Sequence, residues 1–281
     1  MFLRCVGRHL LTNAHNALGI PSRRGGAVYG SAYAVQEEEI RQKLQRFPGG
    51  SINLVKQESG IAVMTISNPA RMNAFSGTMM LELQDHVSQL EEWTEGKGLI
   101  VRGDAGTFCS GSDLNAVRAI SDPQEGMKMC MFMQNVLTRL LRLMTVGSEI
   151  RFVHKHMGLV PGWGGAARLV RIVGSQNALK LLAGAQKVDP AYAEQIGLSD
   201  GVVGPQEGEA AEAGVALGEA EQWLSSFTRG PASVIQAVKK VVLSGRELPL
   251  EDALRTERDV FGTVWGGPAN LDALARKSKH K

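Results

Sequence analysis

The chain has 281 residues, of which 43% are hydrophobic and 21% charged, so it is long enough to bury a substantial core. No uninterrupted apolar run is long enough to span a membrane, and the three cysteines have neither disulfide-framework nor zinc-site spacing. Residues 1–36 hold four of the 31 basic residues and no acidic one; the remainder, with 27 basic and 28 acidic residues, is nearly neutral, which disfavours nucleic-acid binding.

Residues 1–36 form a leader that we expect to lie outside the fold. Arginines, serines and a stripe of apolar residues in this stretch are typical of a mitochondrial transit peptide, and a disordered leader fits equally well. Residues 37–281 are expected to form one domain, because no low-complexity linker or simple repeat divides them. Its C-terminal part, from about residue 162, is predicted to be helical.

The first predicted elements alternate between strands and helices. A charged run at residues 37–43 indicates a short exposed helix, and β-branched stretches at 51–57 and 61–66 indicate a hairpin. An amphipathic helix follows, with Ser76 as its N-cap, and residues 98–102 form a buried strand that ends in a glycine-rich loop. This order predicts an α/β fold with its site at the ends of strands.

The second half of the chain is predicted to be mainly helical. Residues 123–143 form a helix rich in methionine, which is either gap-filling core or a pliant wall for an acyl chain. Residues 150–153 indicate one more strand. Further helices are predicted at residues 166–173, 175–184, 190–196, 207–227, 231–243 and 250–260.

The segment Asn68–Ser76 reads Asn-Pro-Ala-Arg-Met-Asn-Ala-Phe-Ser, a bend followed by a helix start. It resembles the segment of the crotonase (enoyl-CoA hydratase/isomerase) superfamily that holds the coenzyme A nucleotide. The resemblance implies substrate binding by Arg71, Met72 and Ala74. Arg71 supplies a cation that can meet a phosphate.

The segment Gly106–Leu114 reads Gly-Thr-Phe-Cys-Ser-Gly-Ser-Asp-Leu and is similar to the superfamily loop that binds the thioester. The resemblance implies that the peptide N–H of Ser112 donates to the thioester oxygen. It also implies substrate contacts from Ser110, Gly111, Asp113 and Leu114. The residue pattern alone makes Asp113 a helix cap rather than an acid.

The segment Ile150–Leu169 resembles the superfamily stretch that carries a catalytic glutamate in hydratases, but His154 stands at that position. Hydration of a double bond commonly uses two carboxylates, so hydratase chemistry is disfavoured. A histidine here is typical of the ethylmalonyl-CoA decarboxylase branch, which implies a catalytic role for His154. Trp163 is expected to form a wall of the acyl pocket, or to pack at a subunit contact.

The resemblance implies a crotonase-like spiral of ββα units with a C-terminal helical segment, in which one strand–turn–helix unit is missing. The second oxyanion donor of the superfamily lies in a Gly-Gly-Gly turn, and no such turn occurs between Arg142 and Ile150. A gap of roughly 25–30 residues corresponds to one supersecondary motif. Loss of one donor typically lowers kcat by about 10²–10³, so we expect weak or absent catalysis.

The implied reaction is decarboxylation of ethylmalonyl-CoA or methylmalonyl-CoA, as metabolite repair in the cytosol, with no metal or organic cofactor. The alternative locality is the mitochondrial matrix, because of the arginine-containing start. The expected partners are an acyl-CoA thioester and further copies of the chain, as a trimer or a dimer of trimers. Two other functions remain open: a catalytically inactive CoA-binding subunit, and an enoyl-CoA hydratase or isomerase.

Overall fold

The computed structural model describes residues 2–4, 32–120, 122–137, 141–142, 144–145, 148–204 and 213–278. Helix α2 (Ala32–Leu44) begins ahead of residue 37, where the sequence predicts the domain to start. It is also not an exposed helix, because Ile40 and Leu44 are 1% and 0% exposed and belong to the main core. The charged residues around this apolar pair led to the prediction of an exposed helix. The spacing of four residues places both apolar side chains on one helix face.

The main sheet has five strands in the order β2-β3-β4-β1-β5. Strand β2 (Ser51–Lys56) forms the predicted hairpin with β3 (Ile61–Ser67), and β3 runs parallel to β4 (Gly98–Gly103). Strand β1 (Phe2–Arg4), from the predicted leader, pairs antiparallel with both β4 and β5 (Leu141–Arg142). The sheet therefore joins the two ends of the N-terminal half of the chain.

The helix predicted over residues 123–143 is wrong at its C-terminal end. Helix α5 (Pro123–Leu137) stops earlier, and Leu141 is extended because it pairs with Leu3 of β1. Pairing with a distant strand overrides a local helical pattern of this kind. Two of the helix's methionines, Met129 and Met133, are buried in the core, as the gap-filling interpretation predicted, whereas Met127 is 54% exposed.

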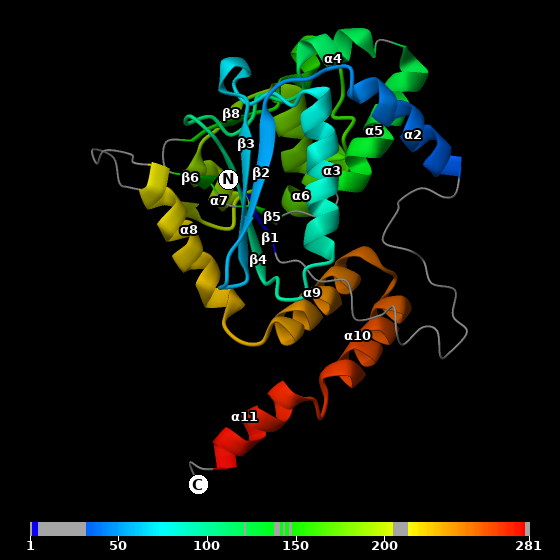
Figure 1. Ribbon diagram of the computed structural model, residues 1–281. Coiled ribbons are helices and arrows are strands. Elements are labelled where there is room, and N and C mark those ends of the chain that lie inside the picture. The colour runs from blue at the N-terminus through cyan, green and yellow to red at the C-terminus, as the bar shows by residue number, and fades with distance from the viewer. Residues whose placement is uncertain are drawn as a thin grey trace.

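The two faces of the sheet are covered by different helices (Figure 1). In β3, Ala62, Met64 and Ile66 face one core cluster, and Ile61 and Val63 face another, as the two-residue period of a strand requires. The first cluster lies under α2, α3 (Gly77–Glu91) and α5, and the second under α8 (Ala213–Thr228). The sheet is thus the middle layer between two helical layers.

The remaining elements build a smaller unit beside the main sheet. Helix α4 (Leu114–Ala119) is not part of it, since its C-cap Ile120 packs in the main core cluster. In the smaller unit, two short ladders pair β6 (Met144–Thr145) with β9 (Val202–Val203) and β7 (Ile150–Arg151) with β8 (Lys187–Val188). The strand predicted at 150–153 ends at residue 151, since its partner β8 is only two residues long. Turn η3 (Val153–Met157), α6 (Gly165–Gly184) and α7 (Pro190–Gln195) complete the unit. The predicted break within α6 is confirmed at Gly174, whose φ is 76°.

Three helices end the chain: α9 (Ala232–Glu247), α10 (Leu250–Val264) and α11 (Pro268–Ser278). Helices α9 and α10 pack on each other, and α11 extends away from the body (Figure 1). Large apolar side chains on this segment are exposed, including Leu250 at 73% and Trp265 at 69%. None of the helices in the described part of the chain is long and apolar enough to cross a membrane.

Candidate active site

Backbone hydrogen bonds join the first two sequence motifs side by side. The N–H of Phe75 donates to the carbonyl of Gly111 at 2.8 Å, and the N–H of Asp113 donates to the carbonyl of Phe75 at 2.9 Å. These bonds form a parallel bridge between Phe75 and Ser112, and the N–H of Ser110 donates to the Met72 carbonyl at 3.0 Å. The segment expected to bind the CoA nucleotide therefore lies directly against the loop expected to bind the thioester.

A buried asparagine joins these two segments through side-chain hydrogen bonds. Asn73 is fully buried, and its Nδ2 donates to the carbonyls of Asp104 and Thr107 at 2.8 and 2.5 Å. Its Oδ1 accepts from the N–H of Asn68 at 2.7 Å, while Asn68 Nδ2 donates to the Ala74 carbonyl at 2.8 Å. The φ of Asn73 is 56°, a left-handed conformation that asparagine tolerates better than most residues.

The predicted nucleotide-binding residues divide into exposed and buried groups. Arg71 ends the short turn η2 (Pro69–Arg71) and is exposed, and Met72 is 64% exposed, so both side chains are available to a ligand. Ala74 is only 6% exposed, and its N–H donates to the Arg71 carbonyl. Its carbonyl already accepts from Asn68 Nδ2, so the structure does not bear out a substrate contact from Ala74.

The loop at residues 110–113 leaves one peptide N–H without an acceptor. Ser110 donates to Met72, Gly111 donates to Cys109 Sγ at 3.3 Å, and Asp113 donates to Phe75. Within the described residues, the N–H of Ser112 has no such partner, because in a parallel bridge its polar groups point away from the neighbouring strand. This is the group that the sequence predicted to donate to a thioester oxygen.

The flanking residues of this loop have structural roles. The Asp113 carboxylate accepts from the N–H of Asn115 at 2.8 Å, which confirms the predicted helix cap. Gly111 has a φ of 108°, and a Cβ at this position would meet no atom within 4 Å, so space remains open beside it. The Ser110 hydroxyl donates to the Arg71 carbonyl at 3.1 Å. Leu114 is 49% exposed at the start of α4.

Cys109 is placed in this loop but is unsuited to nucleophilic chemistry. Burial raises the pKa of its thiol to about 11, so the thiol is neutral near pH 7.

Across the part of the chain that the structure describes, no group of three or more His, Cys, Asp or Glu side chains could hold a metal ion.

The third motif packs on the same core from the other side. Trp163 is half-buried against the main core cluster, as are Phe108 and Cys109 of the thioester loop. Gln134 of α5 donates to the carbonyl of Gly162 at 2.6 Å and so fixes the loop that carries the tryptophan. This placement agrees with a pocket wall and leaves the alternative of a subunit contact open.

His154 lies on η3, half-buried, and its Nδ1 is buried without a hydrogen-bond partner. The next residue, Lys155, donates to the carbonyl of Ala183 at 2.7 Å and holds η3 against the end of α6. Among the described residues, no hydrogen bond joins His154 to the first two motifs. The structure thus connects the first two motifs directly, and leaves His154 on a neighbouring element with one nitrogen unused.

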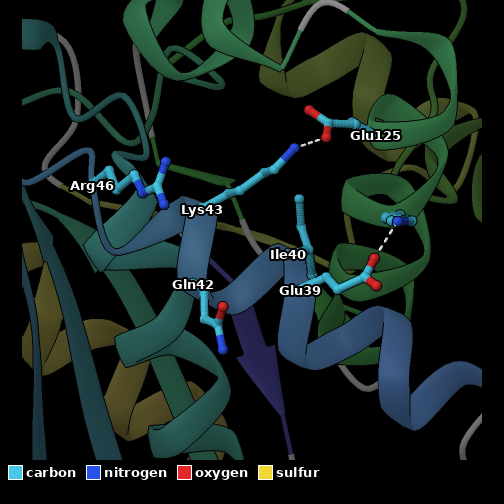
Figure 2. Close-up of a pocket in the computed structure, with 7 residues that line it drawn as sticks. Glu39, Ile40, Gln42, Lys43, Arg46 and Glu125 are labelled. Carbon is cyan, nitrogen blue, oxygen red and sulfur yellow. Dashed lines mark hydrogen bonds and ion pairs between the residues drawn. The ribbon is translucent and has the colours of Figure 1, made fainter.

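A separate hollow of about 180 Å³ lies between α2 and α5, and the sequence did not predict it. Figure 2 shows Lys43 directed toward Glu125 across it, and Glu39 forms an ion pair with Lys128. The hydrogen bond from Lys128 also lowers the pKa of Glu39. These pairs fasten α2 to α5, and we assign the hollow a structural role.

Comparison with known proteins identifies related chains. The family model for enoyl-CoA hydratase/isomerase matches residues 56–147 and 141–266. A protein named ethylmalonyl-CoA decarboxylase from Gallus gallus is 59% identical, over 92% of this chain and 94% of its own length. A solved enoyl-CoA hydratase from Geobacillus kaustophilus HTA426 covers 82% of this chain and 94% of its own, with a TM-score of 0.71 and 20% identity. A putative enoyl-CoA hydratase from Thermobifida fusca YX, solved with CoA, has a TM-score of 0.59 and 21% identity, covering 86% and 97%.

The two solved structures show the fold, whereas the chicken protein is a close relative. Its alignment with this chain is 284 positions long, although 92% of 281 residues amounts to only about 259 residues. About 25 positions of the alignment therefore have no counterpart in this chain. The two parts of the family-model match overlap at residues 141–147.

Proposed function

Because the chain belongs to the enoyl-CoA hydratase/isomerase family, we propose that it binds malonyl-type CoA thioesters and removes CO2 from them. Ethylmalonyl-CoA is the substrate that the related chicken protein's name supports, and methylmalonyl-CoA is a second one. The observation that carries the proposal is the N–H of Ser112, which has no acceptor among the described residues and is held at a fixed position beside the segment proposed to bind CoA.

The reaction needs a place for one electron pair. When the bond between the α-carbon and the carboxylate breaks, CO2 leaves and the bonding electrons pass through the α-carbon to the thioester oxygen, giving an enolate. The N–H of Ser112 donates to that oxygen as its negative charge develops, and a preorganised donor of this kind is typically worth about 2.7–4 kcal/mol. A proton then adds to the α-carbon and the neutral thioester forms again. Because the thioester itself accepts the electrons, the reaction needs no metal or organic cofactor.

His154 supplies the proton in this proposal. Its Nδ1 is buried and has no hydrogen-bond partner among the described residues, so it is the kind of group that a substrate or a bound water would satisfy. A histidine in place of a carboxylate removes one of the two groups that hydratases commonly use. The same substitution therefore favours decarboxylation over hydration.

Substrate binding rests on the exposed end of the first motif. The exposure of Arg71 supports a pairing with a phosphate of CoA, and that of Met72 beside it supports an apolar contact with the nucleotide. Trp163 forms a wall of the acyl pocket, since it packs with Phe108 of the thioester loop against one core cluster. The size of that pocket sets the preference between ethyl and methyl side chains.

The missing strand–turn–helix unit is also part of this proposal. The alignment positions without counterpart and the divided family-model match, which meets at residues 141–147, support a gap after α5. The described residues between α5 and β7 contain only the short strands β5 and β6. A chain with one oxyanion donor fewer would decarboxylate its substrate more slowly than a chain with both donors, by a factor of about 10²–10³.

The gap also favours a second function, that of a CoA-binding protein without catalysis. Incubating the full chain with ethylmalonyl-CoA, methylmalonyl-CoA or crotonyl-CoA separates the possibilities. Decarboxylation predicts CO2 and a saturated acyl-CoA in equal amounts from the first two. Thermal stabilisation by CoA with no product would support the inactive form, and hydration of crotonyl-CoA would support a hydratase.

The C-terminal helices support a proposed homo-oligomer, a trimer or a dimer of trimers. Phe261 and Trp265 of α10 and its cap stack at 5.1 Å between ring centroids, yet are 54% and 69% exposed, and burial against a second copy would remove this surface from water. Light scattering on a gel-filtration column tests the assembly. A cytosolic location belongs to the same proposal. Cell fractionation tests it by comparing the amount of the protein in the cytosol with that in the mitochondrial matrix.

A further inference from the structure

We propose that Ser112 donates twice to the thioester oxygen, through its backbone N–H and through its side-chain hydroxyl. The hydroxyl thereby supplies a second oxyanion donor in a chain whose other predicted donor is missing. The inference rests on the proposed decarboxylation and assigns a catalytic residue for it. It concerns the side chain, whereas the family resemblance concerned only the peptide N–H.

The Ser112 hydroxyl is buried and unused. Among the described residues, the buried side-chain polar atoms without any hydrogen-bond partner are Ser112 Oγ, His154 Nδ1 and His86 Nδ1. His86 has a structural role, since its Nε2 lies 2.7 Å from the carbonyl of Ile52. The other two are the residues that the sequence placed in the catalytic step. A buried polar group without a partner destabilises the protein, and a ligand that satisfies it explains why it persists.

Comparison with the neighbouring serine shows that the arrangement is local to Ser112. Ser110, two residues earlier, has its hydroxyl bonded to the Arg71 carbonyl at 3.1 Å and its N–H bonded to Met72. Both donors of Ser110 are therefore used inside the protein. Both donors of Ser112 lack acceptors among the described residues.

The backbone of Ser112 is held on both sides, so that only its side chain can turn. The carbonyl of Gly111 and the N–H of Asp113 are bonded to Phe75, which fixes the peptide groups before and after Ser112. Rotation about one bond moves the hydroxyl among three staggered positions. Open space lies beside Gly111, and the proposal requires the rotamer in which the hydroxyl turns toward that space, so that it and the backbone N–H can donate to one oxygen.

The chemistry suits a neutral hydroxyl donor. As the bond to CO2 breaks, negative charge grows on the thioester oxygen, and serine hydroxyls serve as oxyanion donors alongside backbone N–H groups. The hydroxyl keeps its proton throughout, so the balance of the reaction is unchanged. Its bond strengthens only as charge develops, so its loss should lower kcat more than it raises KM.

The test compares S112T with S112V, an isosteric pair that differs only in the hydroxyl, and includes S112A. The half-buried Ser225, whose hydroxyl donates to the Gln222 carbonyl at 2.7 Å, gives the matched control S225A. We expect S112A and S112V to lower kcat for ethylmalonyl-CoA by about 10²–10³, with KM changed by less than about threefold. S112T should keep most of the activity, and S225A all of it.

A binding measurement keeps the inference separate from the proposed function. A CoA analogue bearing a nitronate group mimics the enolate, and the unsubstituted chain should bind it more tightly than CoA. S112V should lose that preference and S112T should retain it. If the chain releases no CO2 but S112V still loses the preference, the decarboxylase proposal fails and the second donor stands. Equal kcat and equal preference in S112T and S112V, or no preference in the unsubstituted chain, would overturn the inference.

Discussion

Replacing Asn73 with alanine removes the amide that joins the two segments for which we propose ligand binding. The change takes away the donor for the carbonyls of Asp104 and Thr107 and the acceptor for the N–H of Asn68. Three hydrogen bonds at roughly 1 kcal/mol each give about 3 kcal/mol, and the polar groups left buried raise this further. Alanine also fits the φ of 56° less well than asparagine does. We therefore expect N73A to lose about 4 kcal/mol of unfolding free energy, out of the 5–15 kcal/mol typical of a folded protein.

Urea unfolding followed by circular dichroism measures this loss as a fall in midpoint at constant slope. N53A is the control, because Asn53 is exposed and its side chain donates only a long hydrogen bond, of 3.5 Å, to Ser51 Oγ among the described residues. We expect it to change stability by less than about 0.5 kcal/mol. N73D keeps an acceptor for the N–H of Asn68 but places a carboxylate oxygen next to the carbonyls of Asp104 and Thr107. It should therefore lose as much unfolding free energy as N73A. A loss below about 1 kcal/mol in N73A, at unchanged slope, would refute the reasoning.

Three further predictions concern single residues of the site. Burial holds the folded-state pKa of Cys109 at about 11, above its ordinary 9.0, so the stability that the neutral thiol contributes is complete below pH 9 and is lost as pH rises through 11. The urea midpoint should therefore decline less steeply at high pH in C109A than in the unsubstituted chain. Equal declines in the two proteins would contradict this. R71A should weaken CoA binding by about tenfold at low salt and by less at high salt, measured by calorimetry, and an affinity that ignores salt would argue against a phosphate contact. H154Q should lower kcat while CoA still binds, because glutamine cannot transfer the proton, whereas an unchanged kcat would remove His154 from proton transfer.

Local patterns predicted the elements that depend on neighbouring residues. The caps at Ser76 and Asp113 are bonded as expected, because a serine or aspartate at a helix start needs only its own next turn. The hairpin and the parallel strand β4 were also correct, since their β-branched runs are short and bounded by turn residues. The family, too, could be inferred from three short motifs in order.

Features that depend on distant contacts could not be predicted in this way. Leu141 is extended because it meets β1, and Ile40 is buried because α2 docks on the core, and neither contact is visible in the local pattern. The role of Asn73 was missed as well, although an asparagine after Asn-Pro-Ala-Arg-Met is a sign of a left-handed turn residue. The unused hydroxyl of Ser112 is a property of its surroundings, so only the folded structure reveals it.

The most direct test of the proposed function is the product balance from ethylmalonyl-CoA with the full chain. CO2 and butyryl-CoA should appear in equal amounts and stop when ethylmalonyl-CoA is exhausted. A variant with a Gly-Gly-Gly strand–turn–helix unit inserted at residues 141–147, where we propose the gap, should react faster, by up to about 10²–10³. Failure of both chains to release CO2 while CoA still binds, or faster hydration of crotonyl-CoA than decarboxylation, would contradict the account.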